Sequence, residues 1–277
     1  MRRPGRGAPR ARGPDGERSR EAPEPPAPGT GIVRSAMEGL AVSVRFLTIL
    51  PVPGGTDTQR GLPWAAAFFP LVGLVVGLAV ALVLAAPLPA LPRAALALLV
   101  WIVLTGGLHE DGWMDVLDGV FAPVRPQDRL EILKDPRVGA HGATGGGALL
   151  LIRFAALAAV APAAAPVAAL LGRSAMALSL ATAPPARRTG LGAQFATHPR
   201  GIEASVGAFA LLLFLGDWAG WGRIGLATLF AGIAAVTWSW FLVRRLGGLT
   251  GDGHGAVGYL AEVAALLAFL PLTDVPS

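Results

Sequence analysis

The chain of 277 residues contains no cysteine. Disulfide bonds, thiolate metal sites and cysteine nucleophiles are therefore excluded. Charged residues are also scarce, at 15% of the chain, against about 25% in a typical soluble domain. Lys134 is the only lysine, so arginine carries almost all of the net charge of +5. In a chain with so little charge, we interpret the arginines as part of cytoplasmic loops, and we expect no nucleic-acid partner.

Apolar residues are abundant and form long runs. They make up 53% of the chain, and the mean hydropathy is +0.57. Runs of this length favour an all-α, polytopic membrane bundle over a soluble alanine-rich helical protein. We expect about seven transmembrane helices, over residues 64–86, 93–108, 148–165, 167–183, 204–219, 223–243 and 255–271. Prolines lie between the third and fourth segments, which can also be interpreted as one long kinked helix.

The two ends of the chain differ in composition. Residues 1–36 are rich in arginine, proline and glycine, which predicts a disordered tail. No apolar core follows the basic start directly, so we expect no cleaved signal peptide. Residues 37–277 are predicted to form one membrane-embedded catalytic domain, beginning with a short interfacial helix that ends at Pro51.

The distribution of positive charge predicts an orientation. With the N-terminal tail in the cytoplasm, seven spans also place the loops 109–147, 184–203 and 244–254 there. These loops hold nine of the basic residues, whereas the opposite loops contain no lysine or arginine, as the positive-inside rule requires. We therefore expect a multi-pass protein of the inner (plasma) membrane, with its polar motifs gathered on the cytoplasmic face.

An acidic run follows the second apolar segment. In a helix, Asp111, Asp115 and Asp118 stand at i, i+4 and i+7, on one face. Like charges on one face need a counter-ion, and carboxylates that bind Mg²⁺ usually also hold it against phosphate. The alternative is a solvated acidic loop. His109, just before the run, is a candidate general base or phosphate donor, or simply an interfacial histidine.

Two further motifs contain residues suited to phosphate. Lys134 and Arg137 stand three residues apart before a glycine-punctuated turn, which suits an anion, although they could instead anchor the next span. The glycine-rich segment at Gly251 and Asp252 opens the last apolar helix, where backbone N–H groups can hold phosphate; the alternative is a plain turn between spans. Glu262 lies inside that helix, where a carboxylate is costly and indicates a function or a buried partner.

Arg153 and Arg173 are two further charges near or within apolar segments. Each either extends to the membrane interface or reaches an anionic ligand.

These motifs, in this order, resemble those of the adenosylcobinamide-GDP ribazoletransferase family, also called cobalamin synthases. The resemblance spans roughly residues 37–270, and its most specific element is the acidic run. The matching pieces are Phe46-Leu47-Thr48 with Pro51-Val52-Pro53, Pro70–Gly73, Gly106–Gly119, Lys134–Gly142 and Gly247–Asp252.

The resemblance implies an integral membrane enzyme that closes the nucleotide loop of vitamin B12. Such an enzyme joins adenosylcobinamide-GDP to α-ribazole or its 5′-phosphate, releases GMP and uses Mg²⁺. The implied partners are these two substrates and the lipid bilayer. A homo-oligomer, or an association with other enzymes of the cobalamin pathway, is left open.

The resemblance and the motifs together give a set of expected site residues. The metal ligands would be Asp111, Asp115 and Asp118. The catalytic residues would be His109, Asp111, Asp118, Lys134 and Arg137, with His109 or a non-ligating aspartate accepting the proton. The substrate-binding residues would be Glu110, Lys134, Arg137, Gly251, Asp252 and Glu262.

The chain departs from the family pattern in its last motif. His254 stands where an apolar residue is usual and Tyr259 where a glutamate is usual, so Glu262 alone remains of an acidic pair. Two other classes of membrane protein compete with the resemblance. A CDP-alcohol-type phosphotransferase shares the start of its motif with Asp115–Gly119 but lacks the later aspartates. A transporter would have repeated halves and a site near the midplane, and the sequence shows no evident repeat.

Overall fold

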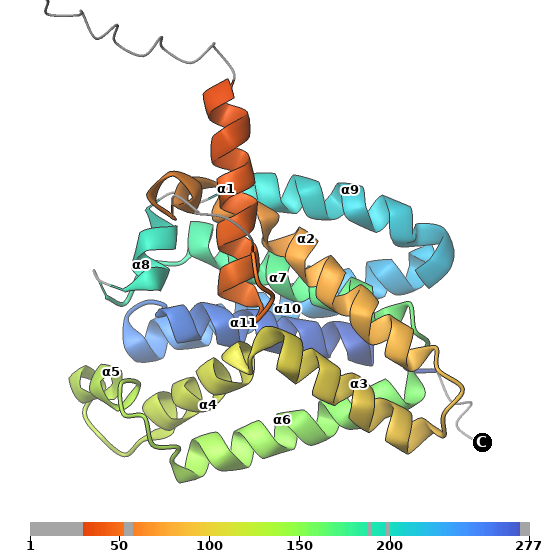
Figure 1. The fold of residues 1–277 in the computed structure, drawn as a ribbon. Helices are drawn as coiled ribbons and strands as arrows, with labels where there is room; N and C mark the ends of the chain where they lie inside the picture. Colours follow the sequence, from red (N-terminus) through yellow and green to blue (C-terminus); the bar gives the residue numbers. More distant parts are fainter. Residues whose placement is uncertain (1–29, 53–57, 188–189, 198–199, 272–277) are drawn as a thin grey trace, which may run out of the picture.

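The computed structural model describes residues 30–52, 58–187, 190–197 and 200–271. These residues form eleven α-helices, one short 3-10 helix (η1) and one isolated bridge between Pro185 and Leu249 (Figure 1). In order, the elements are α1 (Thr30–Leu47), α2 (Thr58–Leu84), α3 (Ala90–Thr105), α4 (Leu108–Phe121), η1 (Pro126–Asp128), α5 (Arg129–Ile132), α6 (Ala140–Ala159), α7 (Ala164–Thr182), α8 (Leu191–Ala196), α9 (Gly201–Ala219), α10 (Trp221–Leu246) and α11 (Gly251–Leu267).

The predicted all-α membrane bundle is confirmed. Five helices, α2, α6, α7, α9 and α10, are long and apolar enough to cross a membrane. The pair α3 and α4, which meet at an 85° bend, counts as a sixth crossing if taken as one broken span. The expected segments 93–108 and 255–271 correspond to α3 and α11, which have only 16 and 17 residues. The described residues therefore hold five or six candidate crossings where about seven were predicted.

The apolar run 148–183 is two helices and not one kinked helix. Helix α6 begins at Ala140, earlier than predicted, and ends where Val160 takes an extended conformation (φ −89°, ψ 156°). Helix α7 begins at Ala164, after Pro162. A turn between them, in which the Ala164 N–H donates to the Ala161 carbonyl at 3.0 Å, separates α6 from α7.

Helix α7 forms the centre of the bundle. Within the apolar windows of the two helices, 78% of α7 is buried but only 17% of α10. Close packing against α2 depends on glycine: a Cβ at Gly73 would lie 2.4 Å from the Ala169 carbonyl oxygen, and one at Gly77 would lie 2.4 Å from the Pro166 Cα. Small residues therefore let the α2 and α7 backbones approach closely, as is common between membrane helices.

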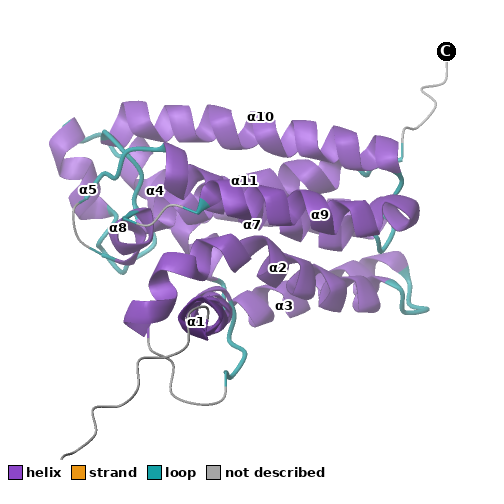
Figure 2. Cartoon of the chain, turned by 90° about the horizontal axis from the view of Figure 1, so that it is seen from above, coloured by secondary structure: helices purple, strands orange, loops and turns teal. Residues whose placement is uncertain are grey.

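Helix α1 lies across the other helices, most of which run side by side (Figures 1 and 2). It packs on α2 at Gly39 and Gly61, where an added Cβ would meet backbone or Cβ atoms at 2.5–2.6 Å. This orientation agrees with an interfacial helix, although α1 begins at Thr30 and includes residues 30–36 of the predicted tail. The remainder of that tail, residues 1–29, lies outside the described residues.

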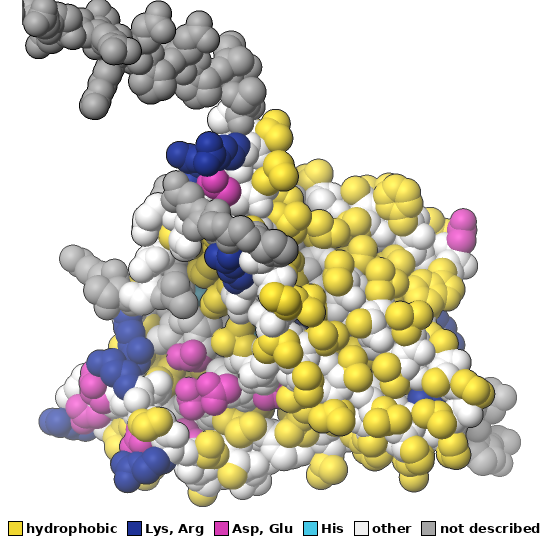
Figure 3. Space-filling view, in the orientation of Figure 1, with side chains coloured by type: hydrophobic (Ala, Val, Ile, Leu, Met, Phe, Trp, Pro, Cys, Tyr) yellow, Lys and Arg dark blue, Asp and Glu magenta, His cyan; other side chains and the backbone are white. Residues whose placement is uncertain are grey.

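The loops expected on one face meet at one end of the bundle. The Ala186 N–H donates to the Leu249 carbonyl at 2.9 Å, and the Leu249 N–H donates to the Pro184 carbonyl at 2.8 Å. Arg245 also donates to the Val120 carbonyl at 2.7 Å, joining α10 to the end of α4. Figure 3 shows acidic and basic side chains gathered at this end, beside a broad apolar surface. We call it the polar end.

Candidate active site

A sharp turn aims the acidic run into the bundle. Gly106 and Gly107 both have positive φ, at 62° and 68°, and separate α3 from α4. Glycine adopts this left-handed conformation without the steric cost that a Cβ brings. The turn buries His109 and Glu110 in the first turn of α4, and the helix then runs toward the polar end (Figure 1). The acidic run is therefore helical, as one reading of the sequence required, and is not a solvated loop.

Three carboxylates from two helices share one region. Asp111 is exposed on α4, whereas Asp115 on α4 and Asp252 on α11 are half-buried. The two helices touch where Gly112 faces Asp252, since a Cβ on Gly112 would lie 3.2 Å from the Asp252 Cα. Asp115 interacts electrostatically with Asp111 and Asp252, and more weakly with Asp118. We call Asp111, Asp115 and Asp252 the carboxylate cluster.

Asp118 has a different set of partners. Its carboxylate accepts hydrogen bonds from the Gly139 N–H at 2.7 Å and the Gly142 N–H at 2.8 Å. These N–H groups belong to the start of α6, where a carboxylate is favoured by the unpaired donors and by the helix dipole. Asp118 thus caps α6 and joins it to α4, a role that the one-face spacing alone did not predict.

The two predicted phosphate-binding cations lie at the polar end, on the segment 122–139 between α4 and α6. We call this segment the outer loop. Lys134 pairs with Glu131 at 2.7 Å, and Arg137 pairs with Asp135 at 2.6 Å. Their side chains are 52% and 86% exposed. The hydrogen bonds from Arg137 lower the pKa of Asp135 to about 2. Lys134 likewise lowers the pKa of Glu131 below its ordinary value.

His109, Glu110 and Glu262 are buried and do not line the cavity described below. Arg153 donates to Glu110 at 2.6 Å and to Glu262 at 2.5 Å. Arg173 pairs with the other oxygen of Glu262 and contacts the His109 Nδ1 at 3.4 Å. The two arginines thus satisfy Glu262 with buried partners, one of the two alternatives that its position in an apolar helix allowed.

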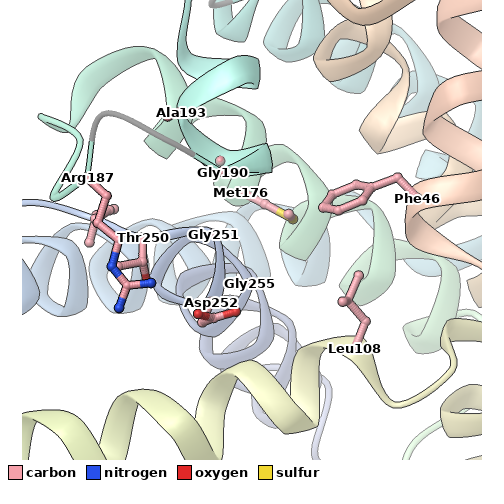
Figure 4. A pocket seen from close by; sticks show the side chains of 12 residues that line it. Phe46, Leu108, Met176, Arg187, Gly190, Ala193, Thr250, Gly251, Asp252 and Gly255 are labelled. Carbon is pink, nitrogen blue, oxygen red and sulfur yellow. The ribbon is translucent and has the colours of Figure 1, made fainter. Parts of the chain in front are cut away.

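A cavity of about 260 Å³ adjoins the carboxylate cluster (Figure 4). Asp252 lies in the middle of the view, with Arg187 and Thr250 on one side and Phe46 and Leu108 on the other. The wall at the start of α11 contains Gly251, and the Thr250 hydroxyl caps that helix by accepting the Gly253 N–H at 3.1 Å.

Arg187 was missed as a site residue by the sequence analysis. It lines the cavity, donates to the Leu130 carbonyl and interacts electrostatically with Asp252. In the sequence it is one of several basic residues on a predicted cytoplasmic loop, so nothing distinguished it. Only the contact between the 184–187 and 249–252 segments places it beside a carboxylate.

The carboxylate cluster has the donor atoms that a hard cation prefers. Among the described residues, no group of three or more His, Asp or Glu side chains forms a closed metal site. Mg²⁺ is commonly held by only one or two carboxylates together with substrate phosphates and water. The exposed Asp111 and half-buried Asp115, one turn apart on α4, fit that open arrangement.

A family model described as cobalamin-5-phosphate synthase matches residues 39–270, from α1 to just beyond α11. The chain belongs to the cobalamin-5-phosphate synthase family. It is therefore an enzyme of cobalamin synthesis, and the resemblance noted from the sequence motifs is confirmed. Family membership also sets aside the lipid phosphotransferase and transporter alternatives.

Relatives in several bacteria support the assignment. An adenosylcobinamide-GDP ribazoletransferase of Roseiflexus sp. (strain RS-1) is 37% identical over 234 residues, covering 81% of this chain and 86% of the relative. The enzyme of the same name from Deinococcus radiodurans is 39% identical, covering 84% and 86%. That of Desulfitobacterium hafniense (strain Y51) is 36% identical, covering 86% and 98%. No solved structure matches the chain.

Proposed function

We propose that this enzyme is an adenosylcobinamide-GDP ribazoletransferase, which makes cobalamin or its 5′-phosphate from adenosylcobinamide-GDP and α-ribazole or α-ribazole 5′-phosphate. The name shared by relatives over more than four-fifths of the chain supports the reaction. The observation that carries the proposal is the carboxylate cluster beside a cavity that also contains a cation, Arg187, and a helix N-terminus. Phosphoryl transfer needs this combination of groups that hold metal and groups that hold phosphate.

Within this proposal, Asp111 and Asp115 would hold Mg²⁺, which would supply positive charge to neutralise the diphosphate of adenosylcobinamide-GDP and to stabilise GMP as the leaving group. Asp111 is exposed and Asp115 is half-buried, so both carboxylates are accessible on α4. Asp118 supports them indirectly, because its two hydrogen bonds fix the end of α4 against α6.

The cavity suits the smaller substrate. A volume of about 260 Å³ is just below the 300–1,000 Å³ that is roughly typical of small-molecule sites, so we assign the nucleoside to it and not the much larger corrinoid. Phe46, Leu108 and Met176 give apolar contacts for the base of α-ribazole. Arg187 and the N–H groups at the start of α11 hold anionic oxygens. The corrinoid then lies outside, at the polar end.

Asp252 is the general base in this arrangement. It lines the cavity, whereas His109 is buried and its Nδ1 faces the Arg173 guanidinium, which can only donate. A ribose hydroxyl oxygen of α-ribazole attacks the phosphorus on the cobinamide side and gives its proton to Asp252. The bond from that phosphorus to the bridging oxygen breaks, and GMP leaves with the bond's electrons.

The outer loop and the membrane complete the proposal. Lys134 and Arg137 attract the guanosine diphosphate end of the substrate from their exposed positions. The enzyme lies in the inner (plasma) membrane with its polar end in the cytoplasm, supported by the basic residues gathered in the loops of that end.

The test is a turnover assay on the purified enzyme in detergent or liposomes. Adenosylcobinamide-GDP and α-ribazole, or its 5′-phosphate, are supplied with Mg²⁺ or with EDTA, and GMP and cobalamin are followed by mass spectrometry. We expect metal-dependent product from the natural enzyme and a loss of about 10²–10³-fold in kcat for Asp111→Asn. The matched control is Asp217→Asn, an exposed aspartate on α9 remote from the site, which should leave turnover unchanged. Product from neither ribazole substrate, with folded protein, would refute the proposal.

A further inference from the structure

Five ionisable side chains from four helices meet inside the bundle. Helix α4 supplies His109 and Glu110, α6 supplies Arg153, α7 supplies Arg173 and α11 supplies Glu262. None of the five is more than 5% exposed. We call them the buried charge network.

The network is electrically balanced. Each arginine has a carboxylate partner, and Glu262 accepts from both guanidinium groups, one at each oxygen. The Arg153 guanidinium also lies 4.1 Å from the centre of the Trp101 ring, a cation–π contact with α3. Buried ion pairs seldom stabilise a protein more than apolar residues of the same size would, so their value is often geometric.

The geometry in question is that of the two helices that carry the carboxylate cluster. Glu110 immediately precedes Asp111 on α4, and Glu262 is on α11 together with Asp252. Arg153 spans these helices, because one guanidinium nitrogen contacts Glu110 and another contacts Glu262. The planar guanidinium fixes the angle between its two acceptors, which a lysine ammonium cannot do.

We propose that the buried charge network is a positioning device, in which Arg153 and Arg173 set the separation and register of α4 and α11 and thereby hold the carboxylate cluster together. Arg153 acts on both helices directly, whereas Arg173 acts through Glu262 and His109. The functional consequence rests on the proposed metal-dependent transfer, but the effect on helix position does not. None of the five side chains needs to touch a substrate.

The lack of cysteine allows a direct test of helix position. Nitroxide labels at Phe121→Cys on α4 and Leu267→Cys on α11, both exposed positions, report the distance between the helices by pulsed EPR. Arg153→Lys keeps the positive charge but loses the planar guanidinium. We expect it to shift this distance, or to broaden its distribution, by about 1–2 Å or more. Arg153→Gln should do so more strongly, with Arg173→Lys between the two. The control is Glu203→Gln, which breaks an ion pair with Arg200 at the start of α9, outside the network and away from both labels, and should leave the distance unchanged.

A second measurement separates positioning from simple stabilisation. Mn²⁺, which can replace Mg²⁺ and is visible by EPR, is titrated into each folded variant with adenosylcobinamide-GDP present. We expect Arg153→Lys to weaken Mn²⁺ binding about tenfold and to lower kcat more than it raises KM. An unchanged EPR distance in both Arg153 variants and in Arg173→Lys would overturn the inference. So would a lower melting temperature with unchanged distance and Mn²⁺ affinity. Absence of Mn²⁺ binding or turnover in the natural enzyme would instead count against the proposed function, and the distance measurement would still decide the inference.

Discussion

Glu110 and Asp111 are neighbours on α4, yet their carboxylates are in opposite environments. Glu110 points into the bundle and is neutralised by Arg153, whereas Asp111 is exposed beside two other carboxylates. The same division recurs on α11, between the buried Glu262 and the cavity-lining Asp252. Each helix thus carries both a buried carboxylate that is paired with arginine and a carboxylate that is exposed or lines the cavity. The surroundings of each carboxylate, and not its residue type, separate the two kinds.

The largest effect should come from the available carboxylate on α11. Asp252→Asn keeps the shape but removes the proposed proton acceptor, so kcat should fall by about 10²–10⁴-fold. The melting temperature should stay close to that of the natural enzyme, because Asp252 has no ion pair to lose within the described residues. Turnover and thermal unfolding in detergent measure both. A loss of activity below tenfold would remove Asp252 from its role as base.

The buried carboxylate on α11 should behave in the opposite way. Glu262→Gln leaves Arg153 and Arg173 short of a buried negative charge, which should lower the free energy of unfolding by about 3–5 kcal/mol. The control is Glu203→Gln, which breaks a half-exposed pair with Arg200 and should cost at most about 1 kcal/mol. Tryptophan fluorescence during SDS titration in mixed micelles gives both values. Equal costs for the two variants would contradict the distinction between buried and exposed pairs.

Asp118 lies between these two classes, because its partners are backbone N–H groups. Asp118→Ala removes the cap of α6 and should destabilise the protein by about 0.5–2 kcal/mol, as for other N-caps. Asp118→Asn retains an acceptor oxygen and should lose less than half as much. The same SDS titration ranks the two variants. If the asparagine variant were the less stable one, the negative charge, and not the hydrogen bonds, would be the important feature.

The smallest effect concerns the exposed pair of Asp135 and Arg137. Arg137 lowers the pKa of Asp135 to about 2, so the pair is intact above the ordinary carboxyl pKa of about 3.9 and is lost as pH falls toward 2. In Arg137→Gln, the Asp135 pKa should return toward its ordinary value, as followed by NMR of the carboxyl carbon. Global stability at neutral pH should not change measurably, because the pair is exposed. An unchanged Asp135 pKa would show that the pair does not persist in solution.

The sequence predicted the helices better than the contacts between side chains on different helices. Long apolar runs predicted most of the membrane helices, and the i, i+4, i+7 spacing predicted the carboxylate face of α4. Arg153 and Arg173 had two readings, extension to the interface or an anionic ligand, and the structure gives a third, since both pair with carboxylates inside the bundle. Those contacts join residues 43 to 109 positions apart, which no local pattern encodes.

The sequence left one further feature of the fold open and missed one residue of the site. It did not decide whether the Pro162 region kinks one helix or separates two, because composition alone allows both. Arg187 looked like any other loop arginine until the 184–187 segment paired with the start of α11. Both features depend on tertiary contacts, which no sequence motif encodes.

The Asp118 cap has a mechanical consequence for the outer loop. By holding the Gly139 N–H, it ties together two points 21 residues apart and makes the segment between them a closed ring. Lys134 and Arg137 are carried on this ring, so the exchange of their local partners for a substrate, as the proposed function requires, would not move them far from the site. Tethering of this kind keeps the local concentration of a flexible group in the millimolar range or above. The length of the ring therefore limits how far two exposed cations can move from a site that they do not touch.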